Sequence, residues 1–124
     1  MPKQIRLNSV DMNCVAHQSL ALWAHPRDRA DHYNTLDYWV ELARIFERGK
    51  FDALFLADVL GTYDVNRGSP DTAIANAVRG PVNDPLLLIS AMAYVTRNLG
   101  LALHARSRTN TPTRWRGVFR RSIT

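Results

Sequence analysis

Residues 36–58, LDYWVELARIFERGKFDALFLAD, decide the fold of this chain. Apolar side chains recur at helical spacing through the first part, with charged residues on the opposite face, and predict a helix over Leu36–Lys50 that Gly49 ends. The segment FDALFLA at residues 51–57 is mostly apolar and predicts a strand buried on both faces. This strand ends abruptly in a charged residue, Asp58.

The flanking sequence repeats the alternation of strand and helix. We predict a strand at Ile5–Asn8, followed by a long ordered segment over residues 9–35 that has no regular period. After the central strand we predict a long loop that contains a short helix at Thr72–Val78. A deeply packed helix capped by Asp84 then extends from Leu86 to Gly100, and a strand follows at Leu101–Leu103. Long loops follow the strands and short turns follow the helices, which favours a (β/α)8 TIM barrel. A complete barrel needs roughly 250 residues. The predicted fold class is therefore α/β, the N-terminal part of a TIM barrel truncated after about three strands.

The composition of the 124 residues, 46% hydrophobic and 22% charged, is typical of a globular domain and not of a disordered or fibrous chain. No apolar stretch reaches the roughly 20 residues of a membrane span. The single cysteine, Cys14, indicates a reducing compartment, so we expect a cytoplasmic protein with no membrane partner.

The net charge of +5 is unevenly distributed. Residues 1–103 carry 10 Lys and Arg against 11 Asp and Glu, whereas residues 104–124 carry 6 Arg and no acidic residue. The chain thus divides into a nearly neutral part and a basic tail. The tail alone suggests an alternative function, a small basic nucleic-acid-binding protein.

Asp58 is the strongest candidate for chemistry. A carboxylate directly after an apolar strand lies at the carboxyl edge of the sheet, where barrel enzymes bind ligands, although a turn cap or an ion pair with an arginine stays open. We also considered whether the other histidines form a metal site, whether the cysteine is a nucleophile and whether the glycines form a phosphate-binding loop. In each case, and for the aromatic residues on helical faces, we favour a structural role. These residues are His17, His25, His32, Cys14, Gly61 and Gly68, with Trp39, Phe46 and Tyr94 interpreted as core residues.

Four segments carry a resemblance to a known family: DMNCVAHQ, LWAHPRDR, LDYWVELARIFERGKFDALFLADVLGTYDV and PVNDPLLLISAMAYVTRNLGLAL. Together they resemble the N-terminal region of the nitrilotriacetate monooxygenase component A group, which belongs to the bacterial-luciferase-like flavin monooxygenases. The resemblance extends over nearly all of residues 1–103, and the combination of FDALFLAD with VNDPLLL is its most specific feature.

The resemblance implies a TIM-barrel enzyme that uses reduced FMN and molecular oxygen to oxidise a small organic substrate of aminopolycarboxylate or organosulfur type. It also implies an NAD(P)H:FMN reductase as flavin supplier, and homo-oligomers are common among such barrels. The family's aspartate at the end of the second strand contacts FMN, which implies cofactor binding by Asp58. His104 replaces a threonine that contacts FMN in the family, and neither His17 nor Trp23 is given a role. No catalytic residue and no metal ligand is assigned.

The tail departs from the family pattern, which continues after the third strand with a segment resembling SYEHPYPxARRxSxLDHL. Permitted codons for Arg108–Thr124, read one base earlier, encode SYEHPYPLARRVSSLDH. We therefore expect that the reading frame is lost between about Leu103 and Ser107, and that the tail, 104–124, is out of frame and disordered. Because an opened barrel exposes unpaired strand edges, we also expect this chain to aggregate or fold partially, to bind FMN only weakly and to be inactive.

Overall fold

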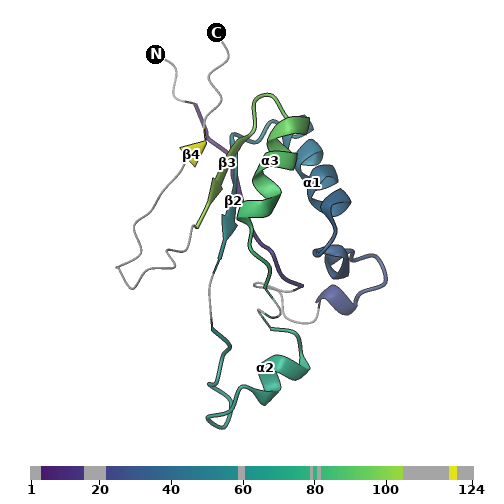
Figure 1. Ribbon diagram of the computed structural model, residues 1–124, viewed down its shortest axis with the longest axis vertical. Helices are drawn as coiled ribbons and strands as arrows, with labels where there is room; N and C mark the ends of the chain where they lie inside the picture. The colour runs from purple at the N-terminus through teal and green to yellow at the C-terminus, as the bar shows by residue number, and fades with distance from the viewer. Residues whose placement is uncertain are drawn as a thin grey trace.

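The computed structural model describes residues 4–15, 22–58, 61–78, 80, 82–104 and 118–119. The strands are β1 (Asn8–Met12), β2 (Ala53–Ala57), β3 (Gly100–Leu103) and β4 (Val118–Phe119); the α-helices are α1 (Leu36–Arg48), α2 (Asp71–Ala75) and α3 (Leu86–Val95); two short 3-10 helices are η1 (Leu22–Ala24) and η2 (Ala30–His32). The strands form one sheet in the order β1-β2-β3-β4, in which the first three are parallel and β4 is antiparallel to β3 (Figure 1). The predicted alternation of parallel strands and helices is confirmed.

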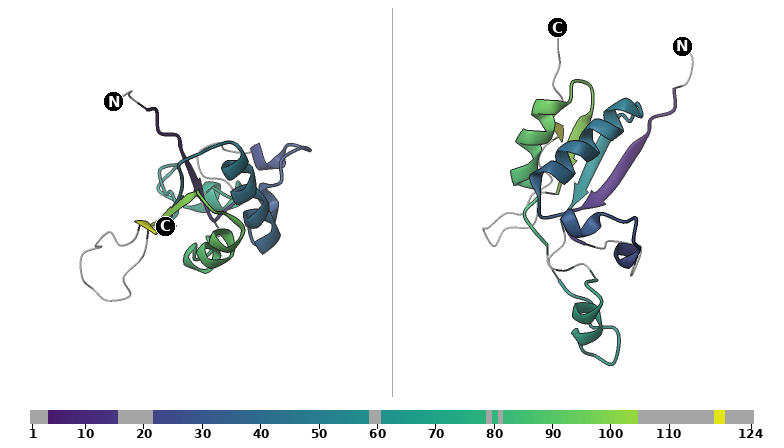
Figure 2. Two further views of the ribbon diagram at one scale, coloured as in Figure 1. Left: turned by 90° about the horizontal axis from the view of Figure 1, so that it is seen from above. Right: turned by 90° about the vertical axis from the view of Figure 1, so that its right-hand side faces the viewer.

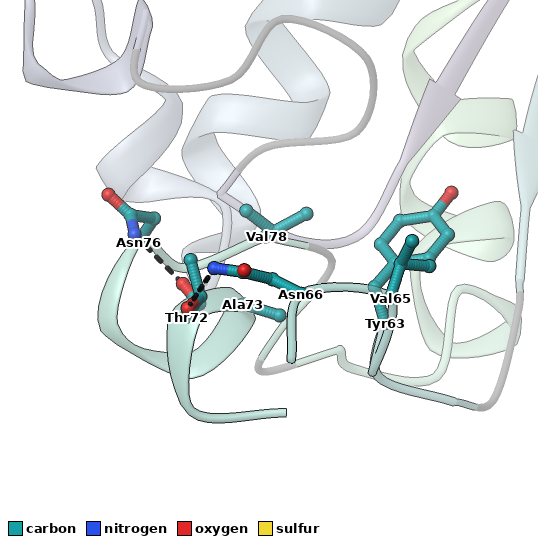
Figure 3. A pocket seen from close by; sticks show the side chains of 7 residues that line it. All are labelled: Tyr63, Val65, Asn66, Thr72, Ala73, Asn76 and Val78. Atoms are coloured by element: carbon teal, nitrogen blue, oxygen red, sulfur yellow. Dashed lines mark hydrogen bonds between the residues drawn. The ribbon is translucent and has the colours of Figure 1, made fainter. Parts of the chain in front are cut away.

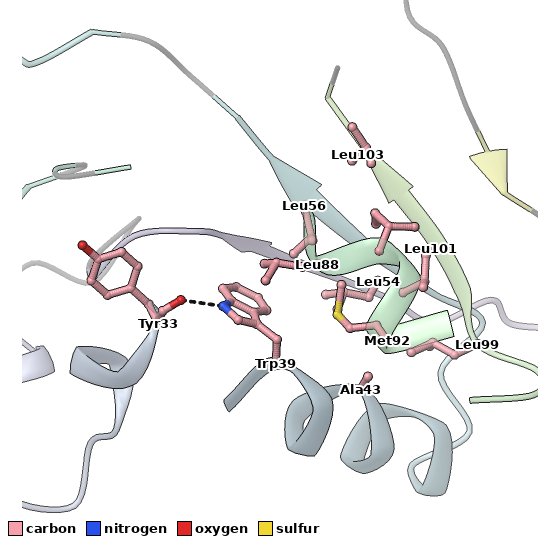
Figure 4. Packing of buried hydrophobic residues seen from close by; sticks show 11 residues of the cluster. Tyr33, Trp39, Ala43, Leu54, Leu56, Leu88, Met92, Leu99, Leu101 and Leu103 are labelled. Carbon is pink, nitrogen blue, oxygen red and sulfur yellow. Dashed lines mark hydrogen bonds between the residues drawn. The ribbon is translucent and has the colours of Figure 1, made fainter. Parts of the chain in front are cut away.

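Helices α1 and α3 pack against each other on one face of the sheet (Figures 1 and 2). Side chains alternate along a strand, so every second residue points to this face. The leucines of β2 and β3 that do so are buried: Leu54, Leu56, Leu101 and Leu103. Trp39 of α1 and Met92 of α3 pack against them with no exposed surface (Figure 4). Phe46 is partly buried against the same core. The interpretation of Trp39 as a core residue is confirmed.

The opposite face of the sheet has no covering helix among the described residues (Figure 2). Val10, Phe55 and Ala102 form one row on this face, because Val10 pairs with Phe55 and Phe55 pairs with Ala102. Val10 is 55% exposed, and the other two side chains are half-buried. The prediction that the strand after α1 is buried on both faces is therefore wrong for this chain. Its apolar composition fits a strand covered on both sides, but the helices cover only one.

The first strand lies further along the chain than its sequence pattern indicates. Alternation of apolar and polar residues predicts a strand at Ile5–Asn8, which is wrong, and Ile5 is 87% exposed. β1 instead pairs with the whole of β2 and ends at Met12, opposite Ala57. Pairing with a neighbouring strand, and not local alternation, sets the bounds of β1. Asn13 is therefore the first residue after β1.

Helix α3 ends at Val95, so the prediction that it continues to Gly100 is wrong. Thr96 takes an extended backbone, and its hydroxyl donates a hydrogen bond to the carbonyl oxygen of Met92 at 2.8 Å. Only the sheet-facing side of α3 is buried, at Leu88, Ile89 and Met92. Tyr94 is 89% exposed because no other element covers the outer side of α3 in the described part of the chain. The interpretation of Tyr94 as a core residue is therefore wrong.

Helix α1 ends close to its predicted stop, and a short helix, α2, lies where one is predicted. Gly49 follows α1 with an ordinary φ of −72°, and the left-handed conformation falls instead on Lys50, at φ 60°. Gly61 and Gly68, in contrast, do use positive φ, at 136° and 65°. Both lie at exposed positions of the long connection between β2 and α3.

Side-chain contacts hold the amino edge of the parallel strands. The carboxylate of Glu47 accepts hydrogen bonds from the backbone N–H groups of Arg97 and Asn98 at 2.7–2.9 Å, which joins α1 to the turn before β3. Arg6 and Asp52 form an ion pair of 2.6 Å before β1 and β2. In barrel folds this edge contributes to stability, whereas the opposite edge binds ligands.

No helix within the described ranges is both long and apolar enough to span a bilayer. The expectations for the basic tail fall outside the described residues, apart from His104 and the backbone of β4.

Candidate functional site

Three polar residues follow the parallel strands at their carboxyl ends. Asn13 comes directly after β1, Asp58 directly after β2 and His104 directly after β3. β1 and β2 end opposite each other, so Asn13 and Asp58 occupy neighbouring positions along the edge. The backbone N–H of His104 donates a hydrogen bond to the carbonyl oxygen of Leu56 at 3.1 Å, which extends the pairing of β2 and β3. Ligands of α/β folds bind at this edge.

Asp58 lies where the sequence predicts it, at the carboxyl end of a central strand, and only 4% of its surface is exposed. Buried carboxylates are rare because the charged form loses its hydration, so they occur where partners or ligands compensate. Asp58 engages in interactions within the protein. Its position is at the carboxyl edge, where α/β folds bind their ligands.

Asn13 is a candidate site residue that the sequence pattern missed, because the misplaced first strand left it inside an irregular stretch. It is 2% exposed, and its Oδ1 atom is buried without a hydrogen-bond partner among the described residues. An unpaired buried acceptor costs about 1–3 kcal/mol, and folded proteins contain few of them. Its neighbours Met12 and Cys14 are both buried as well, which only the structure shows.

Two hydrogen bonds join the segments that follow the strands. The backbone N–H of Asn83 donates to the carbonyl oxygen of Asn13 at 3.0 Å, which ties the segment before α3 to the end of β1. The indole N–H of Trp23 donates to the carbonyl oxygen of Asn76 at 3.3 Å. This second bond joins the loop after β1 to the connection after β2, and gives Trp23 a structural contact.

The connection after β2 holds a pocket of about 300 Å³ (Figure 3). This connection lies on the carboxyl side of the sheet (Figure 1). Its lining residues are Tyr63, Val65, Asn66, Thr72, Ala73, Asn76 and Val78. The amide of Asn66 donates to the hydroxyl of Thr72 at 2.7 Å, and the amide of Asn76 donates to the carbonyl oxygen of Thr72 at 2.8 Å (Figure 3). None of these lining residues is charged. A lining that is apolar, with polar groups already bonded to one another, fits an uncharged ligand.

The other candidates do not gather into a site in the described ranges. His25 and His32 are exposed, Cys14 is 5% exposed, and His17 lies outside the described residues. No group of three or more His, Cys, Asp or Glu residues suited to a metal ion occurs among the residues that the structure describes.

No protein-family model matches this chain, but curated proteins do. The chain is 58% identical over 103 residues to the long-chain alkane monooxygenase of Geobacillus thermodenitrificans. It is 52% identical over 105 residues to the dimethyl-sulfide monooxygenase of Hyphomicrobium sulfonivorans. These matches cover 83% and 85% of this chain, but only 23% and 22% of the relatives. The chain therefore spans less than a quarter of the length of these curated relatives.

Solved structures agree with these relatives. The crystal structures of a long-chain alkane monooxygenase and of the Hyphomicrobium enzyme superpose with a TM-score of 0.80 each, at 58% and 52% identity, over 83% of this chain and 24% and 22% of theirs. A riboflavin lyase solved with a modified FMN and riboflavin superposes with a TM-score of 0.72 at 34% identity, over 82% of this chain and 23% of its own.

The nitrilotriacetate monooxygenase component A of Aminobacter aminovorans is 31% identical over 93 residues, which are 73% of this chain and 20% of that protein. This identity is lower than that of the alkane and dimethyl-sulfide enzymes. The resemblance is thus confirmed for the luciferase-like monooxygenases as a whole and not for the nitrilotriacetate group in particular. The nucleic-acid-binding alternative is not favoured. The homologues of this chain are luciferase-like flavin monooxygenases, and its parallel strands form part of their TIM-barrel fold.

Proposed function

We propose that this chain is the N-terminal part of the monooxygenase component of a two-component system. In this proposal the protein takes reduced FMN from an NAD(P)H:FMN reductase and uses molecular oxygen to oxidise a small organic substrate. The observation that carries the proposal is the burial of Asp58, 4% exposed, at the carboxyl edge of strands that superpose on flavin monooxygenases.

The residues at this edge fit a flavin ring. The ring carries N–H donors, and the edge presents the Asp58 carboxylate together with an unpaired acceptor, Oδ1 of Asn13. A bound flavin supplies the redox chemistry with oxygen. The part of this chain is to accept hydrogen bonds from the ring, to orient it, and to exclude water with the loops that Asn83 and Trp23 tie together.

The pocket after β2 favours an organosulfur substrate over an aminopolycarboxylate. Burying several carboxylates requires cationic partners, and the residues that line this pocket carry none. The relatives at 58% and 52% identity act on alkanes and dimethyl sulfide, as their names state, and both compounds are uncharged. An NMR titration of the isotope-labelled chain compares a small dialkyl sulfide with nitrilotriacetate. Shifts at Ala73 and Val78 are expected for the sulfide, and shifts for nitrilotriacetate alone would reverse the assignment.

We also propose that the basic tail, residues 104–124, derives from a shifted reading frame. The match to the alkane monooxygenase extends over 103 of the 124 residues, and the tail carries 6 of the 16 Lys and Arg residues. Resequencing the gene from the Leu103 codon to beyond the stop tests this proposal. An inserted or deleted base is expected, and a frame that stays intact in repeated genomic reads would contradict it.

The flavin assignment is tested in a complete barrel. Residues 1–103 of this chain are fused in frame to the remainder of the Geobacillus relative, and affinity for reduced FMN is measured anaerobically, followed by turnover with a reductase. Asp58→Asn is expected to weaken FMN binding by roughly tenfold or more, the loss of a hydrogen bond to a charged acceptor. Asp64→Asn, at an exposed position of the same connection, serves as the matched control.

Equal affinities for the Asp58→Asn and Asp64→Asn fusions would remove the support for flavin binding at this edge. The 124-residue chain itself is expected to bind FMN weakly and to show no oxidation, because it spans less than a quarter of the length of the relatives it matches. Micromolar FMN affinity of this chain, measured by fluorescence quenching, would contradict that expectation.

A further inference from the structure

We infer that Asn13 is a second flavin-binding residue, which accepts a hydrogen bond from the ring and makes no contact with the phosphate. This inference rests on the proposed function and adds a residue to it. It starts from an observation independent of Asp58: Oδ1 of Asn13 is buried and has no hydrogen-bond partner among the described residues.

The backbone around Asn13 is held firmly, so the unpaired side chain is not the result of a loose chain end. β1 pairs with β2 up to Met12, the neighbouring Cys14 N–H donates to the carbonyl oxygen of Met12 at 2.7 Å, and Asn83 N–H donates to the carbonyl oxygen of Asn13 itself at 3.0 Å. Both main-chain neighbours of Asn13 are buried. The backbone of Asn13 is therefore fixed at the carboxyl edge, beside the position of Asp58, and its side chain is buried there.

A purely structural asparagine, 2% exposed, would be expected to have its carbonyl oxygen paired. A leucine of similar shape would fill the same space without an unpaired acceptor. The presence of the amide is explained when a bound molecule brings the missing N–H donor, because the ligand then satisfies the acceptor that the protein leaves open.

The chemistry of the acceptor selects the part of FMN that binds here. Asn13 Oδ1 and the Asp58 carboxylate are both acceptors, and a phosphate dianion has no proton to donate and is repelled by a carboxylate. The N–H edge of the isoalloxazine ring has the required donors. The strand ends of β1 and β2 therefore receive the ring edge, and the phosphate lies elsewhere.

The test compares Asn13→Leu with Asn8→Leu in the full 124-residue chain. Asn8 is the exposed first residue of the same strand, at the opposite end from the site, so the control carries the same substitution. Two quantities are measured: the urea midpoint without ligand, and binding of dithionite-reduced FMN and of riboflavin by amide NMR shifts at millimolar concentration.

Asn13→Leu is expected to leave the ligand-free midpoint unchanged or higher, because it removes an unpaired buried acceptor. It is expected to weaken binding of both FMN and riboflavin about three- to tenfold, the contribution of one hydrogen bond, while Asn8→Leu changes neither affinity. A lower midpoint for Asn13→Leu would show that the side chain has a structural bond and would overturn the inference. Weakened binding of FMN but not of riboflavin would overturn the assignment to the ring.

Failure of this inference and failure of the proposed function give different results. If reduced FMN shifts the Asp58 amide and Asn13→Leu leaves its affinity unchanged, flavin binding stands and the role of Asn13 is refuted. If reduced FMN shifts no resonance near Asp58 in the fusion to the Geobacillus relative, the proposed function is refuted and the role of Asn13 with it. The fusion to the Geobacillus relative repeats both comparisons in a closed barrel, so association of the short chain cannot hide either outcome.

Discussion

Replacing Gly100 with alanine is expected to destabilise the fold, although Gly100 has an ordinary backbone conformation. An added Cβ atom would lie 3.0 Å from the carbonyl oxygen of Asp52 and 3.3 Å from Cβ of Ala53. β3 cannot shift away easily, because the Gly100 N–H donates to that same carbonyl oxygen at 2.8 Å. Overpacking of this kind costs about 1–3 kcal/mol, and the smaller entropy of the unfolded alanine chain offsets about 0.4–1 kcal/mol. A net loss of about 0.5–2 kcal/mol is expected.

Urea unfolding followed by circular dichroism measures this loss. Protein concentration is kept low, because the exposed Val10 and the half-buried Phe55 on the face without a described helix promote association. With a slope of about 1.5 kcal/mol per molar urea, the midpoint should fall by roughly 0.3–1.3 M. Gly80→Ala is the matched control, since a Cβ there meets no atom within 4 Å, and its midpoint should stay equal or rise. A Gly100→Ala midpoint equal to or above that of Gly80→Ala would refute the close approach of β2 and β3.

Four further changes test contacts away from the site. Glu47→Ala should lower the unfolding free energy by about 1–3 kcal/mol, because backbone N–H groups before β3 lose a charged acceptor. Glu41→Ala, which removes an exposed ion pair, should lower it by at most about 1 kcal/mol, as urea unfolding will show. The hydrogen bond from Arg6 lowers the pKa of Asp52 in the folded protein. The ionised carboxylate therefore stabilises the fold fully above its ordinary pKa near 4, and this stabilisation is lost as the pH falls through the lower pKa of the folded state. In Arg6→Ala, an NMR titration should find the pKa of Asp52 raised. Burial raises the pKa of Tyr38 to about 12. The protonated phenol of Tyr38 therefore contributes fully to the stability of the fold below pH 10, and this contribution is lost as the pH approaches 12. Tyr38→Phe should remove the last phenolate absorbance step, and its persistence would contradict the assignment.

Sequence patterns predicted the helices and strands that are defined by residues within about ten positions of one another along the chain. The apolar stripe of α1 identifies that helix, and the run FDALFLA identifies β2 and places Asp58 after it. The end of α3 was not predictable in this way. The residues after Val95 are polar (Thr96, Arg97 and Asn98) and suit an exposed helical turn as well as a loop. The chain leaves the helix where Thr96 becomes extended to begin the turn into β3.

By itself, the sequence determined the order of strands and helices, the type of α/β fold and the position of Asp58 after a central strand, because periodicity and the polar–apolar boundary are local properties. The tertiary structure was needed to define which residues form β1, to show that β2 is only half-buried on the face away from α1 and α3, and to show that Asn13 is buried beside Asp58. Strand register depends on hydrogen bonds between segments some 45 residues apart, such as Asn8 opposite Ala53. No local pattern around Asn13 contains that pairing, so its buried, unpaired amide became visible only when β1 and β2 were placed together.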